Sequence, residues 1–307
     1  MNMKKKRFRS AKPDRTLTIM ALIPSIMLLV FVYLPMPGLI LAFKNFKVVD
    51  GIFGSEFCGL KNFSFFFKSS DAATVLRNTL GMNLIFIVMT LVVSVAVALM
   101  LNEIRSRRTV KAIQTIMFFP YFISWVVAAY MVYAFLNQQY GIMNSVCDFL
   151  HIPRVAWYAD SKYWPFILSF LYIWKNAGYQ SVIYYATIIG IDDSYYESAA
   201  LDGASRWQMA WNITLPCMKN VIICITTLAI GRVMYSDFGL FYQVPRDVGA
   251  LYATTDVLDT YIYRALRVTG NVGASAAVGF VQAITGFALI MITNLIVRKI
   301  DKDSALF

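Results

Sequence analysis

The segment Tyr195–Pro216, YYESAALDGASRWQMAWNITLP, lies between two long apolar runs at 165–190 and 217–235. It is polar and rich in small residues, so we expect it at a membrane surface and not within the bilayer, where polar groups are costly. Ser194 and Glu197 have the spacing of a capping box, with Ser194 as the N-cap of a helix. The segment therefore predicts a structured surface loop that joins two membrane spans.

Within this loop the residues predict two short helices separated by a bend. Gly203 has no Cβ atom, so it permits a bend and the close approach of another backbone. Leu215 precedes Pro216, which disfavours the helical region, so we expect the second helix to end there, before the next span. Asp192 and Asp193 are interpreted as helix-start residues that are favoured by the N-terminal dipole. A capped surface helix on which nothing docks is the alternative interpretation.

Composition places the chain among membrane proteins. Hydrophobic residues make up 59% and charged residues 15% of its 307 residues, whereas a soluble chain has about 25% charged residues. A bilayer span needs about 20 mostly apolar residues. Six segments meet this requirement: 17–43, 78–101, 112–136, 165–190, 217–235 and 272–297. We therefore expect an all-α, polytopic membrane protein with about six transmembrane helices.

The first apolar run is interpreted as a retained span. It is longer than the apolar part of a signal peptide, and no small-residue cleavage site follows it. Pro24, Pro35 and Pro37 should kink or shorten it. The expected organisation is a basic cytoplasmic N-terminal segment (1–16), a first transmembrane helix (17–43), an extracytoplasmic loop (44–77), a five-helix core (78–300) that contains the loop 192–216, and a cytoplasmic tail (301–307).

The distribution of lysine and arginine predicts the orientation. These residues are denser in the N-terminal segment, around 105–111 and near the C-terminus than in the longer connections on the other side. By the positive-inside rule, both termini and the loop 192–216 are expected in the cytoplasm. The net charge of +11 is explained by this topology and by anionic lipid head groups that attract the run Lys4–Arg15. Nucleic-acid binding is not expected.

Several motifs resemble those of ABC importer permeases. The coupling loop of that family reads Glu-Ala-Ala, then Gly, then Ile-x-Leu-Pro, and the matching positions here are Glu197, Ser198, Ala199, Gly203, Ile213, Leu215 and Pro216. Ser198 departs from the usual alanine but keeps a small side chain. Gly59–Phe63, Leu76–Leu80, Phe118–Pro120 and Tyr140–Asn144 resemble motifs of the maltose-type, carbohydrate-uptake permeases of type I importers. Thr255–Arg264 resembles the polysaccharide and aldouronate oligosaccharide permeases.

This resemblance implies one half of a two-permease channel in a bacterial cell membrane that imports oligosaccharide by alternating access. The implied partners are a second homologous permease, two cytoplasmic ATPase subunits and an extracytoplasmic solute-binding protein. The loop would seat in a cleft of the ATPase, with Glu197 facing a basic residue. The residues implied in this coupling are Glu197, Ser198, Ala199, Asp202, Gly203, Ala204, Ile213, Leu215 and Pro216.

No catalytic or metal-binding constellation is evident in the sequence. The chain lacks a G-x-x-x-x-G-K-[ST] phosphate-binding motif. We therefore expect no enzymatic activity and no cofactor in this chain, and expect ATP and Mg to be bound by the partner ATPase subunits.

The run 165–190 carries the candidates for a substrate path. A lysine at the bilayer centre costs about 2.5–3.5 kcal/mol on insertion scales, so Lys175 should face a protein interior or a wet cavity. Aromatic rings can stack on sugar faces, and amides can hydrogen-bond to hydroxyls. The candidates are Tyr172, Trp174, Lys175, Asn176 and Tyr179, with Tyr121 from the preceding span as a weaker one. Interhelical packing, a carboxylate partner on the second permease for Lys175, and an interfacial position for Tyr121 are the alternatives.

Three other function classes compete with oligosaccharide import, of which a membrane scaffold without a transport role is disfavoured by the polar residues in the run 165–190. The other two are as follows. The first is an ABC permease for peptides or amino acids, against which only the sugar-type motifs argue. The second is an ion-coupled secondary transporter, a class that often carries intramembrane carboxylates and duplicated halves. The expected spans contain Lys175 and Arg232 but no Asp or Glu well inside, so the sequence disfavours this class.

Overall fold

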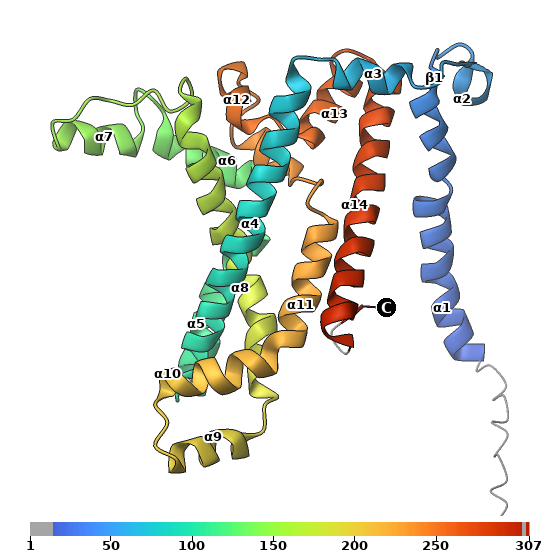
Figure 1. Cartoon of the computed structure of the whole chain (residues 1–307). Coiled ribbons are helices and arrows are strands. Elements are labelled where there is room, and N and C mark those ends of the chain that lie inside the picture. The colour runs from blue at the N-terminus through green and yellow to red at the C-terminus, as the bar shows by residue number, and fades with distance from the viewer. Residues whose placement is uncertain (1–14, 303–304, 307) are drawn as a thin grey trace, which may run out of the picture.

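The structure is a computed structural model, and it describes residues 15–302 and 305–306 (Figure 1). The basic run that begins at Lys4 lies outside the described residues, except for its last residue. The described chain is almost entirely helical. Its only sheet is a pair of two-residue antiparallel strands, β1 (Lys44–Asn45) and β2 (Glu56–Phe57). The expected all-α class is confirmed.

The long helices run side by side, and short helices lie at both ends of the bundle (Figure 1). In chain order the α-helices are α1 (Arg15–Leu28), α2 (Gly51–Gly54), α3 (Lys61–Phe67), α4 (Asp71–Asn102), α5 (Arg107–Phe122), α6 (Trp125–Leu136), α7 (Ile142–Phe149), α8 (Trp164–Ile189), α9 (Asp193–Leu201), α10 (Arg206–Met209), α11 (Leu215–Gly231), α12 (Tyr252–Thr255), α13 (Leu258–Arg267) and α14 (Val272–Ile300). Shorter 3-10 and π elements are η1 (Leu29–Tyr33), η2 (Met36–Phe43), η3 (Ser161–Tyr163), η4 (Ala210–Thr214), η5 (Gly239–Gln243) and η6 (Gly249–Leu251).

The helices long and apolar enough to cross a membrane agree with most of the expected spans. Within the described residues these are Thr16–Phe43, Asp71–Asn102, Arg206–Gly231 and Val272–Ile300. The pair α5 and α6 makes a fifth, broken span. Helix α8 has 26 residues and is therefore about 39 Å long, enough to cross a bilayer. Its polar residues lower its mean hydropathy. Helix α8 therefore meets the length requirement for a sixth span but not the requirement for apolar composition.

The expected third span, 112–136, is not one continuous helix. Helices α5 and α6 meet at an angle of 94°. Ile123 and Ser124 have extended backbones, with ψ of 126° and 150°. The side chain of Ser124 accepts a hydrogen bond from the backbone N–H of Val127 and so caps α6. A serine that favours N-capping therefore breaks an apolar run that hydropathy alone presents as a single span.

Helix α1 stands beside the bundle (Figure 1), and its most apolar window contains no buried residue. After Leu28 the chain changes to the π element η1 and then, beyond Pro35, to the 3-10 element η2. Pro24 lies inside α1. The prolines therefore change the type of helix along this first span and do not end it.

Helix α8 is the central element, because α4 and α5 both pack along it. At the crossing with α5, a Cβ atom added to Gly178 would lie only 1.9 Å from the carbonyl oxygen of Met117. Only glycine allows such an approach of two backbones. Nearer its start, α8 buries Trp164 and Leu168 in the core shared with α6 and η5. These contacts fix the orientation of the polar residues in the middle of α8.

Candidate functional site: the loop 192–216 and the membrane cavity

The loop 192–216 forms a protrusion at one end of the bundle, with α9 at its tip (Figure 1). Helix α9 is capped by Asp192, whose side chain accepts a hydrogen bond from the backbone N–H of Ser194 at 2.9 Å. This bond lowers the pKa of Asp192. The predicted cap at Ser194 is wrong, because α9 already begins at Asp193, so Ser194 lies inside the helix and Asp192 is the N-cap. Asp192 and Asp193 do start the helix.

The bend after α9 lies at Gly203, as predicted. Gly203 has a φ of +78°. Its backbone N–H bonds to the carbonyl of Ala200, and that of Ala204 bonds to the carbonyl of Ala199, which together form a Schellman motif. No atom of the described residues lies within 4 Å of a Cβ built at Gly203. The glycine is therefore needed for the turn, and its outer face is open.

The predicted break before the fifth span is wrong. The chain is helical from Arg206 to Gly231 without interruption. Leu215 has helical angles of −62° and −44°, and its N–H bonds to the carbonyl of Ala210. This π-type bond shifts the hydrogen-bond register directly before Pro216, where a missing N–H is tolerated at the start of the following α-helical stretch. Ile213, Leu215 and Pro216 thus belong to a helix that continues into the membrane.

Two contacts fix the position of the loop, one within it and one to the bundle. The hydroxyl of Tyr196 lies 2.9 Å from that of Thr214, which is buried. Arg206 forms an ion pair with Glu103, the residue after α4, at 2.5 Å. The first contact joins α9 to η4 within the loop, and the second links the loop to the end of α4.

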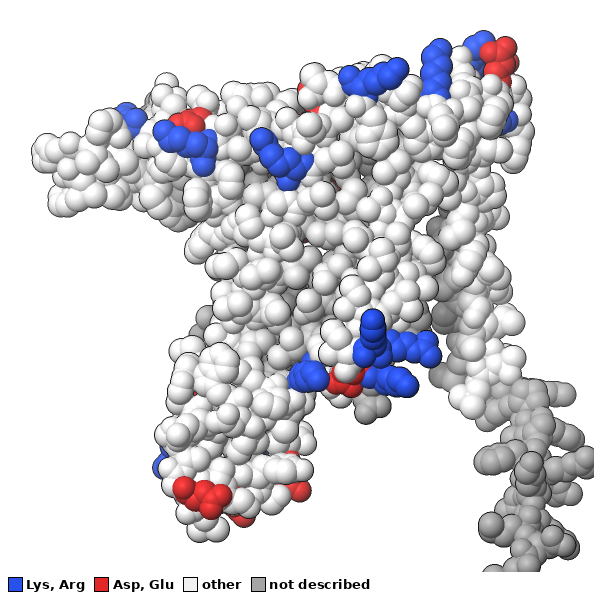
Figure 2. All heavy atoms as spheres, in the orientation of Figure 1, with Lys and Arg blue, Asp and Glu red and all other residues white. Residues whose placement is uncertain are grey.

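The opposite side of α9 is open. Leu201 is 90% exposed and Tyr195 is 60% exposed, although large apolar side chains are usually covered. Glu197, Ser198 and Asp202 are also exposed, while Ala199 and Ala204 are half-buried. Figure 2 shows carboxylates gathered at the tip of this protrusion. The geometry combines an acidic surface, exposed apolar side chains and a rigid connection to the membrane helices.

A polar cavity of about 440 Å³ lies between α4, α8 and the end of α11. Tyr172 and Asn176 line it, as predicted for a substrate path. Tyr172 stacks on Phe86 with ring centroids 4.2 Å apart. Asn83 also lines the cavity, and its amide donates to the carbonyl of Val233 at 2.8 Å. Aromatic faces and amides are thus presented to the same space.

Lys175 points elsewhere, to the break between α5 and α6. Its Nζ donates to the carbonyls of Tyr121 at 2.9 Å, of Pro120 at 3.3 Å and of Ile123. They lie at the C-terminal end of α5, where the last carbonyls lack partners within the helix, and that of Pro120 also accepts from the N–H of Ile123. Because an ammonium group has three donors, these bonds use all of them. The structure thus gives Lys175 a packing contact within this chain, one of the roles left open by its sequence.

The remaining candidates do not line the cavity. The ring of Tyr179 stacks on that of Tyr121 at 4.5 Å, two turns along α8 from Tyr172. Trp174 lines a separate apolar hollow between α6, α7 and α8. The predicted residues of α8 therefore divide among three surroundings.

Comparisons with known proteins identify the fold. Residues 90–304 match the family described as "Binding-protein-dependent transport system inner membrane component". The chain belongs to this family. It is 32% identical to the polygalacturonan/rhamnogalacturonan transport system permease protein YteP of Bacillus subtilis (strain 168), over 94% of this chain and 90% of that protein. It also superposes with a TM-score of 0.84 on a chain of a bacterial alginate ABC transporter crystallised with an alginate pentasaccharide-bound periplasmic protein, with 32% identity over 94% of this chain and 95% of that one.

As such an inner membrane component, the chain is the permease subunit of an ABC transporter and not an enzyme, and the ATPase lies on separate subunits. The ion-coupled secondary transporter considered from the sequence is therefore wrong. The family description also implies that transport by this permease depends on a binding protein.

The permease also contains two charged cavity residues that are not among the substrate-path candidates of the sequence analysis. Arg232 and Asp237 both line the cavity, but no ion pair joins them among the described residues. Asp237 instead accepts a hydrogen bond from the indole of Trp125 at 2.6 Å. Charged residues near a membrane span often have a function. Arg232 and Asp237 could therefore have been chosen from the sequence as candidate site residues.

Proposed function

We propose that this permease imports oligosaccharides into the cytoplasm through the cavity between α4, α8 and α11. Its relatives support this cargo by their names, which include polygalacturonan, rhamnogalacturonan and diacetylchitobiose uptake. The cavity supports it by its chemistry, because Tyr172 offers a flat aromatic ring and Asn83 and Asn176 offer amides beside it. Amides both donate and accept hydrogen bonds, which suits hydroxyl-rich ligands.

The working complex in this proposal contains a second homologous permease, two cytoplasmic ATPase subunits that bind ATP and Mg, and an extracytoplasmic solute-binding protein. Both termini and the loop 192–216 face the cytoplasm of a bacterial cell. Helix α9 seats in a cleft of an ATPase subunit, with Glu197 facing a basic residue.

Closure of the ATPases moves α9, and the loop transmits this motion to the bundle. The continuous helix from Arg206 to Gly231 carries the motion into α11, while the contact of Arg206 with Glu103 carries it to α4. Both helices line the cavity, so their displacement would alternate its access between the two sides of the membrane. The observation that carries this proposal is the exposed α9, with Leu201 90% uncovered, attached to a rigid helical arm.

Transport by the purified complex in proteoliposomes tests the cargo. With the binding protein outside and ATP inside, we expect accumulation of oligosaccharides and none of di- or tripeptides. Replacement of Asn176 by Ala should lower sugar accumulation, whereas Thr187→Ala, on an exposed part of α8, should leave it unchanged. Accumulation of peptides without sugars would show that the cargo is wrong, although the permease role would stand.

A further inference from the structure

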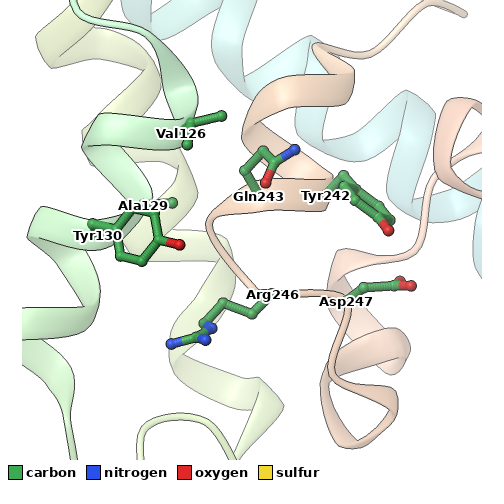
Figure 3. Close-up of a pocket in the computed structure, with 7 residues that line it drawn as sticks. All are labelled: Val126, Ala129, Tyr130, Tyr242, Gln243, Arg246 and Asp247. Carbon is green, nitrogen blue, oxygen red and sulfur yellow. The ribbon is translucent and has the colours of Figure 1, made fainter.

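A second hollow, of about 240 Å³, lies between α6 and the loop that follows η5, on the side of the molecule away from α9 (Figures 1 and 3). Its lining combines a cation, an amide, aromatic rings and a small apolar floor: Arg246, Gln243, Tyr130, Tyr242, Val126, Ala129 and Asp247. Pockets that enclose whole drug-sized ligands start at about 300 Å³. The hollow therefore fits one sugar ring and not a complete oligosaccharide.

The charge of Arg246 is not neutralised within the described part of the chain, where Arg246 makes no ion pair. Its neighbour Asp247 points to the opposite side (Figure 3). There the carboxylate of Asp247 accepts from the hydroxyl of Tyr252 at 2.9 Å and pairs with Arg264 at 3.1 Å. The hollow thus presents a cation whose nearest acid in the sequence is engaged elsewhere.

The guanidinium of Arg246 is held in place by an aromatic ring. Its central carbon lies 4.1 Å from the centroid of Tyr133, a cation–π distance. A guanidinium that rests on a ring by its face keeps the N–H groups at its edge for a planar acceptor. Carboxylates match that edge with two parallel hydrogen bonds.

The backbone at this point is strained. Arg246 and Asp247 have φ values of 60° and 50°, a region that residues other than glycine rarely adopt. Such strain persists where the surrounding structure imposes it, and it is concentrated at binding and active sites. Here two successive lining residues direct their charged groups to opposite sides, and the carboxylate of Asp247 pairs with Arg264.

The hollow and the membrane cavity have no lining residue in common, but a hydrogen bond joins the wall of the cavity to the start of α6. Asp237, which lines the cavity, holds Trp125 at the start of α6. One turn further along α6, Ala129 and Tyr130 line the hollow. A sugar chain that lies along α6 can therefore have one residue in the hollow and later residues at the cavity.

We propose that this hollow is a subsite for one acidic sugar residue, whose carboxylate pairs with Arg246 while Tyr130 and Gln243 contact its ring and hydroxyls. The permease thereby prefers uronate-containing oligosaccharides over neutral ones. This inference rests on the proposed import of oligosaccharides. It adds that the cargo is negatively charged and that Arg246 recognises this charge.

Ligand binding to the purified transporter in lipid nanodiscs, without the solute-binding protein, tests the subsite. The probes are trigalacturonate and its carboxyl-reduced, neutral trisaccharide, and the dissociation constant of each is measured by NMR saturation transfer. A charge-assisted pair should make the acidic probe bind about tenfold more tightly than the neutral one. Arg246→Gln should abolish this difference and leave binding of the neutral probe unchanged, which also shows that the variant is folded.

Two further variants sharpen the comparison. Arg246→Lys keeps the positive charge but not the planar guanidinium group, and it should retain part of the preference for the acidic probe. Arg154→Gln removes an arginine that is already paired with Asp148 and should change nothing. An undiminished preference in Arg246→Gln overturns the subsite. Displacement of trigalacturonate by equimolar inorganic phosphate also overturns it, because the site would then bind any anion. Failure of both probes to bind the parent would also overturn the subsite, whereas the import of oligosaccharides, which depends on a binding protein, is tested separately by accumulation in proteoliposomes.

Discussion

Nη1 of Arg206 lies 2.5 Å from Oε2 of Glu103, and this ion pair joins the loop 192–216 to the end of α4. The side chains are 64% and 46% exposed, so we expect the pair to contribute less than about 1 kcal/mol to stability. We expect the pair to matter for coupling instead, because it connects the segment that carries α9 to α4, a helix that lines the cavity. This separation of stability from coupling makes the pair a useful probe.

Reversal of one charge should therefore impair transport more than folding. We expect Glu103→Arg and Arg206→Glu each to lower ATP-driven uptake several-fold with an unchanged melting temperature, and the double reversal to restore most of the uptake. The same exchange between Arg154 and Asp148, an exposed pair at the other end of the molecule, is the control. Full uptake by both single variants would remove the pair from the coupling path.

Gly203 has two roles in the loop: it forms the turn, and it leaves the surface around the turn open. Because of its φ of +78°, an alanine there should cost about 1–2 kcal/mol, whereas asparagine tolerates this conformation better. If a partner backbone approaches closely, Gly203→Asn should keep the loop folded yet lower coupled ATP hydrolysis, and Gly203→Leu should abolish it. Normal coupling in Gly203→Leu would show that no close docking occurs at this position.

The crossing of α5 and α8 should depend on Gly178. A Cβ at this position would lie 1.9 Å from the carbonyl oxygen of Met117, so Gly178→Ala must push the helices apart. We expect a loss of about 1–3 kcal/mol, typical of overpacking, seen as a lower melting temperature of the purified complex. Gly81 in α4 is the matched control, since no atom of the described residues lies within 4 Å of its Cβ position. An equal effect at both sites would contradict the close crossing.

Lys175 should be important for the shape of the bent span and not for sugar contact. Lys175→Met removes the donor to the carbonyls of Pro120, Tyr121 and Ile123. Pro120 keeps the N–H of Ile123 as a partner, but a buried carbonyl that is left without one costs about 1–3 kcal/mol. We expect reduced thermal stability with an unchanged ratio of uptake between acidic and neutral sugars. A changed ratio with unchanged stability would return Lys175 to the substrate path.

The sequence predicted the fold class and the position of the loop because both depend on composition and on local patterns. Apolar length predicts spans, and Gly203 predicts a turn, without any knowledge of distant residues. The details that it did not predict depend on competition between neighbouring groups. Asp192 caps the helix in place of Ser194, which lies inside it, and a π-type turn keeps the chain helical through Pro216.

The cavity was only partly predictable for a related reason. Helical spacing placed Tyr172, Asn176 and Tyr179 on one side of α8, but only Tyr172 and Asn176 line the cavity, while Tyr179 stacks on Tyr121. The direction of a long, flexible side chain is decided by partners far away in the sequence, such as the α5 carbonyls that bind Lys175. The same holds for Asp237, which bonds to Trp125, 112 residues away.

The most direct test of the central claim is co-purification of this permease from native membranes, with Glu197→Lys compared with the parent. Glu56→Lys, which reverses an exposed charge in β2 at the opposite end, is the control. We predict that the parent and the control retain a second permease and an ATPase, and that Glu197→Lys retains the second permease but loses the ATPase. Retention of the ATPase by Glu197→Lys, or a parent that purifies alone in mild detergent, would contradict coupling through the loop 192–216.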